Sequence, residues 1–150
     1  MHAFVLPTGM IFGLGMALFH GCQTPAKTSQ RAPAVAAVDQ QIAQGAKVYA
    51  QHCAECHRAS GQGTSDAPAL VGKGALPRRP HDGAARQTEF RTALDVATFV
   101  TQNMPPDAET RQAVTEPEYW ALLAFALSAN GVPLSQPVSP QNAAAIVLHP

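Results

Sequence analysis

The residues best suited to chemistry in this chain are two cysteines and a histidine within five positions. Residues 53 to 57 read Cys-Ala-Glu-Cys-His. In a tight turn, the thiols of Cys53 and Cys56 can reach the two vinyl groups on one edge of a porphyrin, and His57 can then offer a neutral imidazole nitrogen to the iron. The spacing therefore predicts one haem, attached through two thioether bonds and ligated on one side by His57.

Two other uses of a Cys-x-x-Cys pair fit the sequence less well. A zinc site needs four ligands, and only His52, His57 and His81 could complete an irregular set, because there is no second cysteine pair. A thioredoxin-type redox pair belongs to a βαβ unit, and the sequence shows no alternating strand pattern. Covalent haem attachment remains the favoured interpretation.

The second axial position of the iron is expected to be filled by Met104. It is the only methionine after residue 21, and it stands at the end of a predicted helix just before Pro105. A lone methionine is more often core packing than a ligand, and His81, His52 or an open site are the alternatives. A thioether ligand favours ferrous iron, and two filled axial positions exclude substrate, as an electron carrier requires.

The elements that must position these residues are helices. Apolar spacing, capping residues and stop signals predict three main helices joined by long loops, at Gln40–Gln51, Leu94–Asn103 and Thr115–Asn130. The stretch from 59 to 85 is rich in Gly and Pro and is expected to be a loop. Loops this long need a packing partner, so we expect an all-α domain wrapped around the haem.

The chain is expected to have four parts. Residues 1–21 are nearly all apolar and uncharged and read as a signal peptide, and Gly-Cys at their end resembles a bacterial lipoprotein cleavage site that would make Cys22 the lipidated residue. A cleaved secretory signal and an uncleaved anchor are the alternatives, and all three place the domain outside the cytoplasm. Residues 22–39 read as a flexible tether, 40–132 as the domain, and 133–150 as a Pro-rich C-terminal tail.

With the haem motif and Met104 in place, residues 40–132 resemble a class I cytochrome c. The resemblance implies that family's fold and places Pro68 and Leu70, from the Pro-Ala-Leu-Val-Gly segment, at the haem. It also implies that the Pro68 carbonyl orients His57, although Ala67 stands where the family often has glycine.

The resemblance implies a close crossing of the first and last helices as well. A glycine on the first helix, here Gly45, would admit an aromatic side chain from the last, here Tyr119 or Trp120. The stretch from Phe99 to Val132 is also similar to monohaem cytochromes paired with molybdenum sulfite or sulfane dehydrogenases of sulfur oxidation.

Charge and composition limit the partners. The chain has 10 Lys and Arg against 10 Asp and Glu, so no basic field points to nucleic acid. Residues 73–91 carry a net charge of +3 and residues 95–118 a net charge of −4, which could pair with haem propionates and steer a redox partner.

The function expected from these features is single-electron transfer on the periplasmic side. The donor would be a dehydrogenase or a quinol-oxidising complex, and the acceptor a cytochrome or an oxidase. No nucleophile or general base is visible, so the chain is expected not to be an enzyme. A permanently bound electron-accepting subunit of a sulfite-type dehydrogenase is the first alternative, and an open-site ligand-binding haem protein is the second.

Overall fold

The computed structural model describes residues 33–80, 84 and 86–149. The predicted signal peptide, Cys22 and His81 lie outside these residues. No described helix has both the length and the apolar character that crossing a bilayer would take.

The described residues are helical, as predicted, and their only strand-like pairing is a single bridge between Thr92 and Val147. The fold class is therefore all-α. Each of the three predicted main helices is present, and two short helices and one 3-10 turn are added to them. The elements in chain order are α1 (Pro33–His52), α2 (Ala54–His57), α3 (Ala93–Asn103), α4 (Ala108–Ala113), α5 (Glu116–Ala129) and η1 (Ala143–Ala145).

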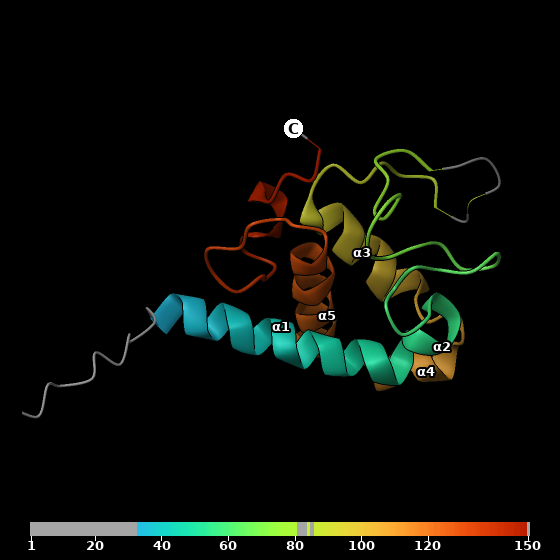
Figure 1. Cartoon of the computed structure of the whole chain (residues 1–150), viewed down its shortest axis with the longest axis horizontal. Coiled ribbons are helices and arrows are strands. Elements are labelled where there is room, and N and C mark those ends of the chain that lie inside the picture. The colour runs from blue at the N-terminus through green and yellow to red at the C-terminus, as the bar shows by residue number, and fades with distance from the viewer. Residues whose placement is uncertain (1–32, 81–83, 85, 150) are drawn as a thin grey trace, which may run out of the picture. The chain divides into compact units, whose positions relative to one another are not determined.

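The centre of the fold is the crossing of α1 and α5, which Figure 1 shows as two helices lying across one another. Gly45 makes the close approach possible, because a Cβ at this position would overlap the backbone carbonyl of Ala121. The side chain nearest to this position is Phe125, and the centre of its ring lies 5.3 Å from that of Tyr49. The prediction that Tyr119 or Trp120 fills this crossing is wrong.

The physical reason lies in the phase of α5 around its axis. Positions four apart lie on the same face of a helix, so Ala121 and Phe125 together face Gly45 on α1. Tyr119 therefore points elsewhere, and its hydroxyl group reaches the carbonyl oxygens of Met104 and Arg111.

The starts of α3 and α5 are fixed by capping boxes. At α5, the backbone N–H and the hydroxyl group of Thr115 donate to the Glu118 carboxylate over 2.8 and 2.7 Å, as the sequence predicts. At α3, Thr92 makes the same pair of bonds to Asp95 over 2.8 and 3.0 Å. These caps satisfy backbone groups that a helix leaves unpaired at its first turn.

The predicted tether is too long, because α1 begins at Pro33 and not at Gln40. Proline suits the first turn of a helix, where its missing N–H is not needed. The following Ala and Val residues continue the helix, and Val38 is buried. Val38 is the one buried residue of positions 33–40, so this part of the helix has no apolar stripe by which the sequence could predict it.

The predicted C-terminal tail is also corrected, because residues 133–149 pack on the domain as a strap. Val138 is 1 % exposed and belongs to the main core cluster. The Gln41 side chain both donates to the Val138 carbonyl and accepts from its N–H, over 2.8 Å each. The strap then runs beside the start of α3 through the Thr92–Val147 bridge. Its prolines end helices and remove donors, but they do not prevent burial of the residues between them.

Candidate haem site

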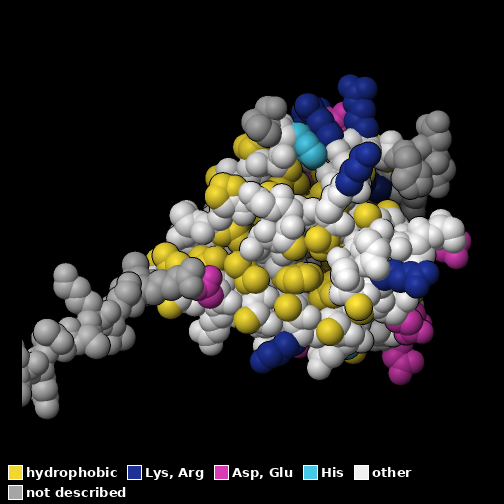
Figure 2. Space-filling view, in the orientation of Figure 1, with side chains coloured by type: hydrophobic (Ala, Val, Ile, Leu, Met, Phe, Trp, Pro, Cys, Tyr) yellow, Lys and Arg dark blue, Asp and Glu magenta, His cyan; other side chains and the backbone are white. Residues whose placement is uncertain are grey.

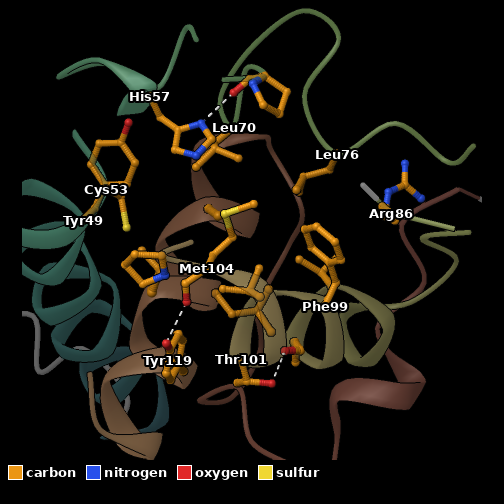
Figure 3. Close-up of a pocket in the computed structure, with 18 of the residues that line it drawn as sticks. Tyr49, Cys53, His57, Leu70, Leu76, Arg86, Phe99, Thr101, Met104 and Tyr119 are labelled. Atoms are coloured by element: carbon orange, nitrogen blue, oxygen red, sulfur yellow. Dashed lines mark hydrogen bonds between the residues drawn. The ribbon is translucent and has the colours of Figure 1, made fainter. Parts of the chain in front are cut away.

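All the haem-site residues that the sequence predicts line one large apolar pocket. Its walls come from the end of α1, the loops after α2, the inner face of α3 and the middle of α5. Its lining includes Cys53, Cys56, His57, Leu70 and Met104 (Figure 3). Most of the residues that line it are apolar, and the pocket is partly open to solvent. A broad apolar lining of this kind suits a flat apolar group such as a porphyrin.

Cys53 joins α1 to α2 and Cys56 lies within α2, and both residues line the pocket. The Cys53 N–H donates to the Tyr49 carbonyl over 2.9 Å, and the His57 N–H donates to the Cys53 carbonyl over 3.0 Å. Cys53 is half-buried, Cys56 is exposed, and neither forms a disulfide. Both sulfurs are thus available for thioether bonds.

Burial, and then the proximity of Cys56, raises the pKa of the Cys53 thiol to about 11. A free Cys53 would therefore be a poorer redox-active thiolate at neutral pH than an ordinary cysteine. In addition, no group of three or more His, Cys, Asp or Glu within the described residues could hold a metal ion.

His57 is held in the tautomer that a metal ligand needs. The residue is only 8 % exposed, and its Nδ1 lies 2.8 Å from the Pro68 carbonyl oxygen. Because a carbonyl can only accept, Nδ1 carries the proton and Nε2 keeps a free lone pair. This is the contact that the cytochrome resemblance implied for Pro68.

Backbone hydrogen bonds hold the loop that carries Pro68 and Leu70. The Leu70 N–H donates to the Gly61 carbonyl over 2.7 Å, and the Leu70 carbonyl accepts from the Asn130 side-chain amide at the end of α5 over 2.8 Å. Tyr49 fixes the start of the loop, since its hydroxyl group donates to the Arg58 carbonyl over 2.5 Å. Ala67, which stands where the family often has glycine, accepts a hydrogen bond at its carbonyl from the Thr64 N–H over 2.7 Å.

Met104 enters the pocket from the opposite side to His57. It caps the C-terminus of α3, where its N–H donates to the Val100 carbonyl over 2.9 Å. Figure 3 shows its sulfur directed into the pocket, on the side that faces the His57 ring. His52, an alternative ligand, also lines the pocket.

Arg86 is a buried cation in the pocket wall. The sequence alone did not predict it as a site residue. It is 7 % exposed and donates to the carbonyls of Pro77, Arg78 and Thr88, and its guanidinium lies 3.8 Å from the centre of the Phe90 ring. Among the described residues, no carboxylate lies within ion-pair distance of it. A buried cation facing an apolar pocket suits the acidic edge of a ligand such as a haem propionate.

The residues present therefore fit a covalently held haem: two free thiols on one edge, an imidazole and a thioether on opposite sides, apolar walls and one buried cation. The family model for cytochrome c matches residues 42–130 of the chain. The chain belongs to the cytochrome c family. Its cofactor is accordingly haem c, bound covalently, and the chemistry indicated by the family is electron transfer.

A solved structure resembles this cytochrome c in both fold and sequence. It is the sulfane dehydrogenase SoxCD from Paracoccus pantotrophus, with a TM-score of 0.52 and 25% identity. The match covers 71% of this chain and 52% of the SoxCD chain, so this cytochrome spans about half the length of the chain it matches. No curated protein matches it in sequence. The predicted resemblance to class I cytochromes, including the type paired with sulfane dehydrogenases, is thus confirmed.

Proposed function

We propose that this cytochrome c is a monohaem carrier whose iron is ligated by His57 and Met104. The observation that carries the proposal is the arrangement of these two side chains, which enter one apolar pocket from opposite sides (Figure 3). Cys53 and Cys56 lie at the edge of the same pocket and would form the two thioether bonds. When bound, the haem supplies a one-electron iron couple.

The chain's own residues would keep the iron inaccessible to substrates. The Pro68 carbonyl holds the Nδ1 proton of His57 and keeps Nε2 available. The Met104 thioether would occupy the other axial position and favour the reduced state. The apolar walls, which include Leu70 and Phe99, would exclude water and raise the cost of a net charge inside.

Charges around the pocket support docking of a partner with complementary charge. Arg78, Arg79 and Arg91 all contact one carboxylate, Glu89, at 2.9 to 3.5 Å, which leaves this group with an excess of positive charge. The segment that follows in the sequence, residues 95–118, carries a net negative charge. Figure 2 shows Lys and Arg side chains gathered toward the top of one face and several Asp and Glu side chains toward its lower right. Such asymmetry orients partners during diffusional encounter.

We place the carrier on the periplasmic side, attached to the membrane through lipid at Cys22. The apolar leader and the Gly-Cys pair at its end support this placement. Electrons would come from a dehydrogenase or a quinol-oxidising complex and leave to a cytochrome or an oxidase.

The likeness to SoxCD favours one second candidate function, that of a permanently bound electron-accepting subunit of a sulfite-type dehydrogenase. Affinity purification of the tagged cytochrome from its native host distinguishes the two roles. A carrier comes away alone at physiological ionic strength, whereas a subunit brings a catalytic protein in fixed ratio.

The proposed ligation is tested by a redox titration of the haem-loaded protein, combined with carbon monoxide binding at neutral pH. We expect a reversible one-electron transition, a six-coordinate low-spin spectrum in both oxidation states and no carbon monoxide complex. Rapid carbon monoxide binding by the wild-type protein would instead favour an open-site ligand-binding protein.

A further inference from the structure

The loop that carries Met104 is fastened by side chains at three successive backbone carbonyls. The Tyr119 hydroxyl group donates to the Met104 carbonyl over 2.7 Å. One guanidinium nitrogen of Arg111 donates to the Pro105 carbonyl over 2.7 Å and to the Pro106 carbonyl over 3.0 Å. Each donor belongs to a helix other than α3, so the loop is tied to α4 and α5 at once.

These hydrogen bonds compensate for the backbone N–H bonds that the residues after Met104 cannot make. Pro105 and Pro106 have no N–H groups, so the backbone after Met104 cannot continue a helix or join a ladder. Only the Met104 N–H makes a backbone bond, to Val100. The methionine side chain itself has three rotatable bonds and does not fix its own sulfur. The position of that sulfur therefore depends on the carbonyls that the other helices hold.

The two donors are themselves well anchored. Tyr119 is buried on α5, and its single hydroxyl proton is shared between two carbonyls, because the Arg111 carbonyl oxygen lies 3.1 Å from the same hydroxyl oxygen. This shared contact links the two fastenings. Arg111 lies on α4, a helix of six residues that begins at Asp107, whose carboxylate accepts from the Thr110 N–H over 2.7 Å. The short α4 thus presents Arg111 beneath the Met104 loop.

We propose that Tyr119 and Arg111 are positioning residues that hold Met104 at the sixth axial site and so set how seldom that site opens. The inference rests on the proposed ligation by Met104. Each lost hydrogen bond should raise the population of the open, methionine-free state, and any outside ligand that needs this state should then bind more tightly.

Imidazole binding to the ferric, haem-loaded protein measures that population. Imidazole must displace the thioether, so its apparent affinity is its intrinsic affinity multiplied by the open fraction. Tyr119→Phe and Arg111→Gln should each tighten imidazole binding about three- to tenfold, from the usual worth of one or two hydrogen bonds. Haem content and helical circular dichroism are recorded for each variant to establish that it has folded.

Two controls separate positioning from general loosening. Thr115→Ala removes a cap from the same helix as Tyr119 and lowers stability without touching the Met104 loop. Arg91→Gln removes an exposed guanidinium group that bonds to Glu89. Both should bind imidazole as the wild type does, and equal tightening by Thr115→Ala would overturn the inference.

A Met104→Ala background distinguishes failure of the inference from failure of the ligation. If Met104 is the ligand, Met104→Ala alone should bind imidazole at least tenfold more tightly than wild type. Adding Tyr119→Phe to it should change nothing further, because no methionine remains to be positioned. If Met104→Ala matches wild type, the proposed ligation fails. Two results would refute the positioning claim alone. In the first, Met104→Ala binds imidazole tightly while Tyr119→Phe and Arg111→Gln keep the wild-type affinity. In the second, Tyr119→Phe changes imidazole affinity equally in the wild-type and Met104→Ala backgrounds.

Discussion

Replacing Gly45 by alanine sets two physical effects against each other, and the structure decides which prevails. Within a helix, alanine is favoured over glycine by about 1 kcal/mol. At this crossing, however, the new Cβ would overlap the Ala121 carbonyl and lie 2.9 Å from the Phe125 Cβ. Neither the Ala121 backbone nor the Phe125 Cβ can rotate away, so α1 and α5 must move apart by about 1 Å, which forfeits roughly a quarter to a half of the dispersion energy of each contact that opens.

Overpacking of this kind costs about 1–3 kcal/mol, occasionally more, and backbone contacts belong at the upper end. After the propensity gain is subtracted, we expect Gly45→Ala to lower the free energy of unfolding of the haem-loaded protein by about 2 kcal/mol. For a domain of this size, the melting temperature should fall by roughly 6–12 °C. Denaturant titration followed by circular dichroism measures the loss.

The matched control lies on the exposed side of the same helix. Lys47 is exposed on α1, so Lys47→Ala and Lys47→Gly report helix propensity alone, and the alanine variant should be the more stable by about 1 kcal/mol. If Gly45→Ala were as stable as the wild type or more so, the close crossing of α1 and α5 would be refuted.

Three further predictions concern the strap, acid stability and the anchor. Gln41→Ala should destabilise the domain by about 2 kcal/mol in denaturant titration, because both the N–H and the carbonyl of Val138 lose their partner; an unchanged midpoint would mean that the strap is not held at this point. Hydrogen bonds from the Thr110 N–H and hydroxyl group lower the pKa of Asp107, so its contribution is present above the unfolded pKa of about 4 and is lost as the pH falls through the folded value. Asp107→Asn should therefore flatten the acid limb of the stability–pH curve, and a curve that is superimposable on that of the wild type would contradict this. Cys22→Ser should move the domain from the membrane fraction to the soluble exported fraction or block its processing, and a wild-type protein that is already wholly soluble and lipid-free would overturn the proposed anchor.

The sequence predicts those parts of the fold that depend on local signals. The capping box of Thr115 and Glu118 lies in neighbouring residues, so the start of α5 could be placed to within one position. The Cys-x-x-Cys-His spacing likewise carries its chemistry within five residues. The covalent cofactor and the all-α fold follow from such signals, and the structure and the family match agree with both.

The parts that the sequence could not predict depend on contacts between distant segments. Gln41 and Val138 are 97 residues apart, and neither local sequence predicts that the Gln41 side-chain amide will bond to the backbone groups of Val138. The partner of Gly45 depends on the rotation of α5 about its axis, which its nearly all-apolar surface does not specify. Arg86 appears in the sequence as one of several basic loop residues, and only the folded chain shows that it is buried in the pocket wall.

The most direct test of the central claim is the intact mass of the denatured protein, purified from a host that matures c-type cytochromes. Thioether bonds survive loss of the fold, so the processed chain should be heavier by one haem than the same processed chain without haem, and the haem-bearing peptide should contain Cys53 and Cys56. The Cys53→Ala/Cys56→Ala variant should have the mass of the bare chain. A wild-type chain that carries no haem after denaturation, with both cysteines open to alkylation, would contradict the account.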